Sequence, residues 1–345
     1  MRDGGQPVTP TGPRVDADTV WRDRNALVIG ASGFLGSHVV WKLQRAGARV
    51  SGLVSPRSSS EVLAERRLAE RMKVWVGDVR DGELLRRIID EDAIDTCIHV
   101  AGIATVGSVA MDPLTAFEIN IKGTWVGVDA FRNSSVKAFV CASSDKAYGD
   151  HGGAPVTEDA PLRAKNAYDV TKACADLLVR SYASQYGLPT VIARVSNIYG
   201  PADLSHRIIP YNVQQILRGQ PPTVVDGTQH YIREFVYISD AADALILLAE
   251  RAGEVAGEAF NVGSGSISMA DLMDTLLRSL DSELKPKILP QRPGIKEIPC
   301  VRINSTKLLG LGWRPRYTLE EGLRATIAWH RRLVESGRFP PIYDA

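Results

Sequence analysis

Short apolar runs alternate with longer amphipathic stretches along most of this 345-residue chain. Continuous apolar runs are typical of parallel strands that are covered on both faces, whereas apolar residues at helical spacing indicate amphipathic helices. The first pair is a run at residues 26–29 followed by a stretch with Val39, Val40 and Leu43 on one face. Repetition of this pair predicts an α/β fold with a doubly wound parallel sheet. Further strands are expected at residues 50–54, 73–77, 96–101, 138–142, 190–195 and 258–262, and further helices at about 112–131, 167–186, 239–251 and 268–280.

The two ends of the chain differ from this pattern. Residues 1–23 are rich in Gly, Pro, Thr and Asp and lack periodicity, so they are expected to form a flexible leader. Near the other end, Thr318 and Glu321 have the spacing of a capping box. This predicts that a final helix begins there and continues through Trp329.

Composition and charge describe an ordinary globular protein. Apolar residues make up 44% and charged residues 23% of the chain. A net charge of +1 gives no general attraction to nucleic acid or to anionic lipid. The chain has neither an apolar run of membrane-spanning length nor a secretory signal, so the cytoplasm is the expected location. The cysteines lack metal-ligand spacing, and reduced thiols are expected at Cys97, Cys141, Cys174 and Cys300.

Three glycines lie between the first predicted strand and the first predicted helix. Gly30, Gly33 and Gly36 permit a tight turn and a close backbone approach. The helix N-terminus behind them presents N–H groups and a positive dipole to a pyrophosphate. A glycine-rich turn without function is the alternative, but the placement between strand and helix favours dinucleotide binding.

The second predicted strand leaves the choice of dinucleotide open. It ends at Val54 without the acidic residue that commonly binds the adenosine ribose of NAD. Ser55 and Arg57 occupy this region and could accept the 2′-phosphate of NADP, although an arginine in a polar loop is often only solvated.

Polar side chains follow the strand predicted at residues 138–142. Ser144, Asp145 and Lys146 lie at the carboxyl end, the edge at which open α/β sheets bind ligands. Tyr168 and Lys172 are four residues apart and share one face of the next predicted helix. A nearby lysine and an oxidised nicotinamide would favour the phenolate, which could remove a hydroxyl proton while hydride leaves. Each group alone is common on protein surfaces, but together with the glycine-rich loop they indicate a redox site.

Together these motifs resemble those of the extended short-chain dehydrogenase/reductases, in the branch of sugar-nucleotide epimerases and dehydratases. The likeness runs from Asn25 to about Val334 and includes Arg-Val-Ser-Asn-Ile-Tyr-Gly-Pro at residues 194–201. It implies a Rossmann domain that binds the dinucleotide and a smaller C-terminal lobe that binds a nucleotide sugar. The Rossmann domain would cover residues 24–195 with a return segment at 232–263, and the lobe residues 196–231 and 264–345.

The resemblance also implies roles for individual residues, with NAD favoured as the cofactor and NADP as the alternative. Ser144, Tyr168 and Lys172 correspond to the catalytic triad of the family. Arginines at matched places would bind a diphosphate, which guanidinium groups bind well. The implied cofactor-binding residues are Gly30, Ser32, Gly33, Phe34, Leu35, Gly36, Ser55, Arg57, Asp78, Val79, Ala101, Tyr168 and Lys172. The implied substrate-binding residues are Thr105, Ser144, Asn197, Arg207, Ile208, Arg233 and Arg292.

The residues after Ser144 select the chemistry within this branch. Sugar-nucleotide 4,6-dehydratases carry an acid and a base at the positions of Asp145 and Lys146, whereas 4-epimerases usually carry small or uncharged residues there. The Asp-Lys pair resembles that of enzymes acting on cytidine diphosphate glucose and of some acting on uridine diphosphate N-acetylglucosamine. A 4,6-dehydratase is therefore expected, which oxidises C4, eliminates water across C5 and C6 and returns hydride to C6. Lys172 and the oxidised nicotinamide are expected to lower the pKa of Lys146.

Two alternatives stay open. A 4-epimerase would use the same triad but return the hydride to C4. A non-catalytic dinucleotide-sensing regulator could share the fold, although the intact Ser144, Tyr168 and Lys172 disfavour it. Val109 stands where a serine is frequent in the family, so sugar contacts are expected to differ there.

The resemblance further implies a homodimer. The helices predicted at about 112–131 and 168–186 correspond to those that pair across a two-fold axis in this branch. Residues that could line a four-helix interface, or equally pack within one chain, are Phe117, Trp125, Leu178 and Tyr182.

Overall fold

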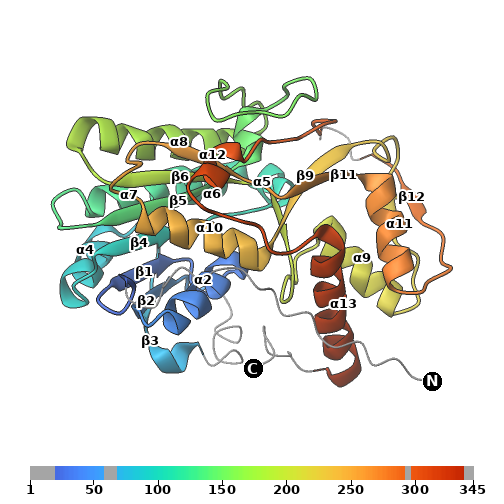
Figure 1. The fold of residues 1–345 in the computed structure, drawn as a ribbon, viewed down its shortest axis with the longest axis horizontal. Helices are drawn as coiled ribbons and strands as arrows, with labels where there is room; N and C mark the ends of the chain where they lie inside the picture. Colours follow the sequence, from blue (N-terminus) through green and yellow to red (C-terminus); the bar gives the residue numbers. More distant parts are fainter. Residues whose placement is uncertain (1–19, 58–67, 292–296, 338–345) are drawn as a thin grey trace.

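The computed structural model describes residues 20–57, 68–291 and 297–337. One sheet of seven parallel strands lies at its centre, in the order β10-β6-β5-β4-β1-β2-β3 (Figure 1). Every strand predicted above is present in it, so the doubly wound parallel sheet is confirmed. The strands are β1 (Asn25–Ile29), β2 (Arg49–Val54), β3 (Met72–Val76), β4 (Thr96–His99), β5 (Ala138–Ser144), β6 (Thr190–Val195) and β10 (Ala259–Val262).

Helices cover both faces of this sheet. One layer contains α2 (Phe34–Arg45) and α10 (Ile238–Glu250), and the other contains α4 (Gly82–Glu91), α7 (Gly123–Ala130) and α8 (Ala167–Tyr186). On β1, Ala26 and Val28 are buried with the first layer, whereas Leu27 and Ile29 are buried with the second. Successive side chains of a strand point to opposite faces, so only a continuous apolar run fills both layers.

The helix predicted at about residues 112–131 is interrupted. α6 (Pro113–Phe117) passes into a π-helical turn, η2 (Glu118–Lys122), which then continues as α7. The buried Asn120 lies in this turn, and π-helical turns occur often at functional sites. A further helix, α5 (Val106–Met111), precedes α6, and Thr105 caps it by accepting a hydrogen bond from the Ser108 N–H.

A smaller lobe gathers at one end of the molecule, around α9, α11 and α13 (Figure 1). The elements of the lobe are β7 (Asn197–Tyr199), α9 (Ile208–Leu217), β8 (Thr223–Val225), β9 (Ile232–Tyr237), β11 (Gly265–Ser268), α11 (Met269–Ser279), β12 (Lys287–Leu289) and α13 (Leu319–Ser336). β9 pairs with β7 and β11, and β12 pairs with β8. The predicted return segment at 232–263 is therefore wrong at its start, because only α10 and β10 return to the large sheet. The apolar run of β9 is compatible with either sheet, and only its partners decide between them.

The N-terminal end of the described chain packs against α10. Trp21 is fully buried and its indole N–H donates a hydrogen bond to Glu250 (2.5 Å). The flexible leader predicted to residue 23 is therefore wrong at its end, and residues 1–19 lie outside the described residues. α13 begins with the predicted capping box of Thr318 and Glu321, which is confirmed. The remaining short elements are η1 (Ala69–Arg71), η3 (Asp145–Tyr148) and α12 (Thr306–Gly310).

None of the helices within residues 20–57, 68–291 and 297–337 has the length and apolar character needed to span a membrane.

Candidate active site

The glycine-rich loop joins β1 to α2 and leaves no space for side chains at two positions. Gly30 has a φ of +93°, and a Cβ there would lie 2.8 Å from the Ala101 backbone. A Cβ on Gly36 would lie 2.0 Å from the Gly30 carbonyl oxygen. Both positions therefore require glycine, and the cradle in front of α2 fits a dinucleotide pyrophosphate. The other predicted residues of this segment lie in the same turn or at the start of α2, namely Ser32, Gly33, Phe34 and Leu35.

Two arginines lie near Asp78, which follows β3. The Asp78 carboxylate accepts hydrogen bonds from Arg80 Nε (2.9 Å) and Nη2 (2.7 Å). These bonds lower the pKa of Asp78 to about 2, and the charge of Arg57 acts in the same direction. Ser55 Oγ accepts a hydrogen bond from the Arg57 N–H (3.2 Å), and the predicted Val79 packs against the start of α7. Arg80 is absent from the predicted site, and its only signal is its position two residues after Asp78.

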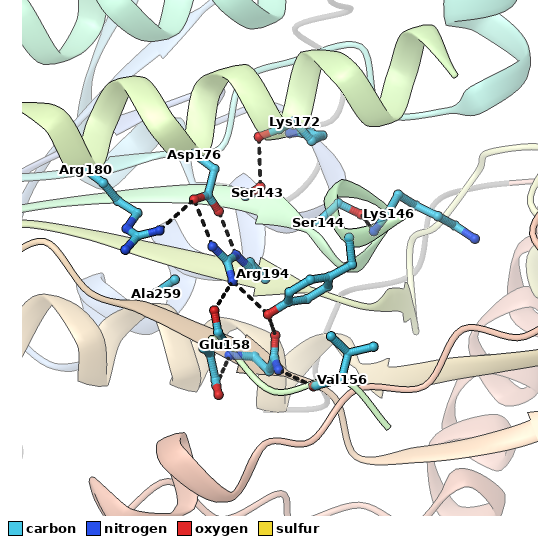
Figure 2. Close-up of polar contacts among 12 residues, drawn as sticks. Ser143, Ser144, Lys146, Val156, Glu158, Lys172, Asp176, Arg180, Arg194 and Ala259 are labelled. Atoms are coloured by element: carbon cyan, nitrogen blue, oxygen red, sulfur yellow. Dashed lines mark hydrogen bonds and ion pairs between the residues drawn. The ribbon is translucent and has the colours of Figure 1, made fainter. Parts of the chain in front are cut away.

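Tyr168 and Lys172 lie on α8 beside the end of β5. The Lys172 ammonium donates a hydrogen bond to the Ala142 carbonyl (3.0 Å), and Ser143 Oγ donates one to the Lys172 carbonyl (3.1 Å; Figure 2). Burial raises the pKa of Tyr168 to about 12, against a hydrogen bond with the Ser144 side chain that lowers it. Burial also lowers the pKa of Lys172. The tyrosine is therefore a neutral phenol here, and a cation beside it would be needed to favour the phenolate.

Asn120 is a residue of this site that sequence reasoning missed. Its side-chain oxygen accepts a hydrogen bond from the Ile103 N–H (2.7 Å), and its amide donates to the Ile103 carbonyl (3.1 Å). The amide also donates to the Thr171 hydroxyl on α8 (3.0 Å). Asn120 thereby ties the loop after β4 to the helix that carries Tyr168. A polar residue in the middle of a predicted helix was its only signal, since a π-helical turn has no clear sequence pattern.

Asp145 and Lys146 begin η3, directly after β5. The buried Asp145 accepts a hydrogen bond from the Ser144 hydroxyl at Oδ1 (3.0 Å), and its Oδ2 has no partner among the described residues. Burial raises the pKa of Asp145, against the charge of Lys146. Burial and the charge of Arg233 lower the pKa of Lys146. The prediction that Lys172 lowers the pKa of Lys146 is therefore wrong. The cation that lowers it is Arg233, and Lys146 extends away from Lys172 (Figure 2).

Two further carboxylates near this pair are absent from the predicted site. Asp169 is 1% exposed, and burial raises its pKa to about 6, opposed by the charge of Lys146. Burial and the charge of Asp145 raise the pKa of Glu234 to about 7. The sequence signals them only through their neighbours, since Asp169 follows Tyr168 and Glu234 lies in the strand segment that begins β9. The end of β5 is thus surrounded by carboxyl groups whose pKa values are raised by burial.

The predicted arginines of the smaller lobe approach the same region. Arg207 precedes α9, and its guanidinium lies 5.5 Å from the ring centroid of Phe34 at the glycine-rich loop. Arg233 is 7% exposed, pairs with Glu297 (2.6 Å) and acts through its charge on the acid and the lysine of η3. Two guanidinium groups near one site suit a diphosphate. Arg292 lies outside the described residues.

The remaining predicted substrate contacts take part in local structure. Thr105 caps α5, Asn197 Nδ2 donates a hydrogen bond to a backbone carbonyl of β9 (2.9 Å), and Ile208 begins α9. Val109 is fully buried in a small apolar cluster with Tyr168. A valine at this position therefore packs beside the tyrosine and offers no polar contact to a sugar.

Comparison with known proteins agrees with this arrangement. Residues 26–263 match the family model described as the NAD dependent epimerase/dehydratase family. The chain is 31% identical over 312 residues to the low-salt glycan biosynthesis protein Agl12 of Haloferax volcanii, and the match covers 89% of this chain and 98% of that protein.

One of two similar solved structures is a dehydratase and the other is an epimerase. The dTDP-glucose 4,6-dehydratase DesIV of Streptomyces venezuelae, solved with NAD bound, has a TM-score of 0.83 and 28% identity, covering 92% of this chain and 100% of that chain. The UDP-glucose 4-epimerase of Thermotoga maritima has a TM-score of 0.81 and 27% identity, covering 90% and 99%. The glycine cradle, the Ser-Tyr-Lys set and the match over most of the Rossmann domain lead to one conclusion: the chain belongs to the NAD-dependent epimerase/dehydratase family and is an enzyme that takes NAD as its cofactor.

Proposed function

We propose that this enzyme is a nucleoside-diphosphate-sugar 4,6-dehydratase. The observation that carries the proposal is the pair Asp145 and Lys146 directly after Ser144, in which the acid is buried with a raised pKa and the half-buried lysine has a lowered pKa. An elimination needs a group that donates a proton and another that accepts one. Epimerisation needs neither of them, so the pair would be superfluous in a 4-epimerase.

In the proposed reaction Tyr168 removes the proton of the C4 hydroxyl. Ser144 lowers the pKa of the phenol by a hydrogen bond, while the Lys172 side chain is fixed to the Ala142 carbonyl (3.0 Å). Bound NAD would supply the hydride acceptor for C4 and the hydride donor for C6. Arg207 and Arg233 would hold the diphosphate, which fixes the sugar relative to the tyrosine.

The elimination then proceeds from the 4-keto sugar. The keto group acidifies C5, so Lys146 can take the C5 proton as the C5–H electrons form the C5–C6 double bond. Asp145 gives its proton to the C6 hydroxyl, which leaves as water. Return of hydride to C6 and of a proton to C5 yields a 4-keto-6-deoxy sugar, and the net change is loss of one water.

A 4-epimerase is the second candidate. It is supported by the similarity to the UDP-glucose 4-epimerase of Thermotoga maritima over 90% of the chain. The same tyrosine and lysine would serve both reactions. A regulator that only senses the dinucleotide is disfavoured, because it has no need of the buried acid and lysine of η3.

Mass spectrometry on a panel of nucleotide sugars separates these candidates. The panel contains dTDP-glucose, UDP-glucose and CDP-glucose, each incubated with the purified enzyme. Loss of water from one of them is the expected result. An unchanged mass with a new chromatographic retention time would assign the protein to the epimerases instead.

The dinucleotide that leaves the denatured protein tests the cofactor site. NAD is expected, because the similar dehydratase DesIV was solved with NAD bound. Recovery of NADP as well would assign Ser55 and Arg57 to its 2′-phosphate.

A further inference from the structure

A buried polar network lies beside Ser143, at the end of β5 (Figure 2). Arg194 of β6 is 1% exposed and donates two hydrogen bonds to Asp176 of α8, from Nε to Oδ2 (2.8 Å) and from Nη2 to Oδ1 (3.0 Å). Its Nη1 donates to the Tyr148 hydroxyl (2.8 Å) and to the Glu158 carbonyl (2.9 Å). The Tyr148 hydroxyl in turn donates to Asn261 Oδ1 of β10 (2.7 Å). One guanidinium group thus joins α8, η3 and β6, and through Tyr148 also β10.

The stability of the fold alone does not explain this network. A buried ion pair often stabilises a fold no more than apolar residues of the same volume would, because both charges lose their hydration. A network whose members are all satisfied has another effect, since any displacement of one element leaves a buried charge or hydroxyl unpaired. The Tyr148 ring further restricts the position of the Arg194 guanidinium group, which lies 4.8 Å from the ring centroid.

The elements that the network joins carry the two halves of the proposed active site. α8 carries the tyrosine and the lysine of the oxidation step, and Asp176 lies four residues beyond Lys172 on the same face. η3 begins with the acid and the lysine of the elimination step and ends with Tyr148. Arg194 lies directly beside Ser143 in the register of β5 and β6. The network therefore ties the end of η3 to the helix behind the tyrosine.

We propose that Tyr148, Arg194 and Asp176 form a positioning network, which sets the place of the acid and lysine of η3 relative to the tyrosine and lysine of α8. The proposal rests on the proposed dehydratase reaction, in which oxidation at C4 and elimination at C5 and C6 act on one bound sugar. A shift of η3 against α8 leaves the oxidation groups where they are and moves the elimination groups. Misplacement by about 1 Å can slow a step on the order of 10²-fold.

The Tyr148→Phe variant tests the network because it removes one hydroxyl and keeps the ring. Wild-type and variant holoenzymes receive the sugar of the panel that loses water, in single turnovers. Absorbance of the reduced nicotinamide follows oxidation at C4, and mass spectrometry follows release of water. Oxidation is expected to stay within about twofold of the wild type, while water release slows by about tenfold or more and reduced nicotinamide accumulates.

Thr190→Val is the matched control. It removes another buried hydroxyl that links β6 to α8, since Thr190 Oγ1 donates to the Val179 carbonyl (2.9 Å), but it lies outside the network. In Thr190→Val the ratio of the rate of water release to the rate of C4 oxidation should equal that of the wild type, even if the melting temperature of the variant falls. Arg194→Lys is a second test, because a lysine keeps the charge but cannot bind Asp176 and Tyr148 together as a fork. It should shift the ratio in the same direction as Tyr148→Phe.

The possible outcomes separate the two proposals. If the wild-type enzyme dehydrates a sugar and Tyr148→Phe slows both steps equally, or neither, the network proposal is overturned and the dehydratase function stands. A ratio shifted as much by Thr190→Val as by Tyr148→Phe also overturns it, because any buried hydroxyl would then suffice. If the wild-type enzyme releases no water from any sugar of the panel, the proposed function fails and the network proposal fails with it.

Discussion

Burial acts on the pKa values of Asp145, Lys146 and Lys172 more strongly than any single neighbour does. Asp145 is 2% exposed, and burial is the main reason why its pKa is raised. The same cause lowers the pKa of Lys146 and of Lys172. Buried groups favour their neutral forms, and these are the directions that the proposed elimination requires of its acid and its base.

Asp145→Asn is expected to stop the reaction after oxidation. The amide keeps the shape of the side chain but has no acidic proton to give to the C6 hydroxyl. Loss of a positioned acid typically costs about 10²- to 10⁴-fold, so the variant should show transient reduced nicotinamide and release almost no water. Water release at a rate near that of the wild type would remove Asp145 from the mechanism.

Lys146→Met is expected to slow removal of the proton from C5. Methionine has a similar length but no base, so deuterium from the solvent should enter C5 about 10²-fold more slowly, whereas oxidation at C4 changes little. The exposed lysine in Lys165→Met provides the control. If both variants of the η3 pair dehydrate at wild-type rates, the epimerase assignment takes the place of the dehydratase.

Gly36→Ala is expected to weaken NAD binding. A methyl group there would lie 2.0 Å from the Gly30 carbonyl oxygen, so the loop must move away from the pyrophosphate position. Affinity measured by calorimetry should fall at least about tenfold, equivalent to about 1.4 kcal/mol. Gly253→Ala is the control, because nothing lies within 4 Å of a Cβ at that position. Unchanged NAD affinity in Gly36→Ala would mean that the cradle tolerates a displaced loop.

At the scale of the elements, buried polar groups fix how helices and strands meet. Arg194 and Asp176 join β6 to α8 with bonds of 2.8 and 3.0 Å. Asp240, in the first turn of α10, is fully buried and accepts a hydrogen bond from the Tyr317 N–H (3.2 Å). Trp313 donates to the Asp240 carbonyl (3.0 Å), so the segment before α13 is held on α10.

Asp240 should make stability depend on pH. Burial raises its pKa from 3.8 to about 6. Between these values the folded chain holds a proton that the unfolded chain has released, so the free energy of unfolding falls as pH rises through this range and is constant above it. Asp240→Asn removes the dependence and keeps an oxygen for the Tyr317 N–H. Relative to the wild type, the variant should gain on the order of 2 kcal/mol between about pH 4 and pH 7.

Urea unfolding at both pH values measures this difference. Asp274→Asn removes an exposed carboxyl group from α11 and serves as the control. An identical pH dependence in the wild type and in Asp240→Asn would show that Asp240 does not titrate in this range.

At the scale of the whole molecule, one face carries apolar side chains that the fold leaves uncovered. Trp125 on α7 is 44% exposed, and Leu177 on α8 is 57% exposed. A shallow hollow between these helices is lined by Trp125, Leu178 and Tyr182 together with charged residues. Tyr182 also donates a hydrogen bond to Asp129 (3.2 Å), so part of the predicted interface serves packing within the chain. An exposed tryptophan between two helices suits an interface.

We expect a homodimer that forms through α7 and α8. Light scattering at micromolar concentration should give twice the mass of one chain. Trp125→Asp should shift the protein to monomers, because a carboxylate buried in an interface without a partner is costly. Ile288→Asp places the same charge at another exposed apolar position, on β12, and should leave the mass unchanged. A monomeric mass for the wild-type protein would contradict the predicted assembly.

Local patterns were sufficient to predict the large sheet and the elements on which the predicted site residues lie. Continuous apolar runs are required wherever a strand is covered on both faces, as Ala26 and Leu27 show by packing into opposite layers. Gly30, Gly33 and Gly36 could be interpreted because backbone geometry is a local property. Tyr168 and Lys172 could be paired because four residues bring side chains to one face of any helix.

The tertiary structure alone decided the remaining features, because they depend on contacts between residues far apart in the chain. β9 has an apolar pattern that suits either sheet, and its pairing with β7 and β11 assigned it to the smaller lobe. Asp169 and Glu234 become part of the site only because the packed chain excludes water from them and raises their pKa values. The sequence places Arg194 in a strand, but only the folded chain brings Asp176 and Tyr148 within hydrogen-bond distance of its guanidinium group. Periodicity and spacing determined which elements form, whereas desolvation and long-range pairing determined which of their polar side chains act together.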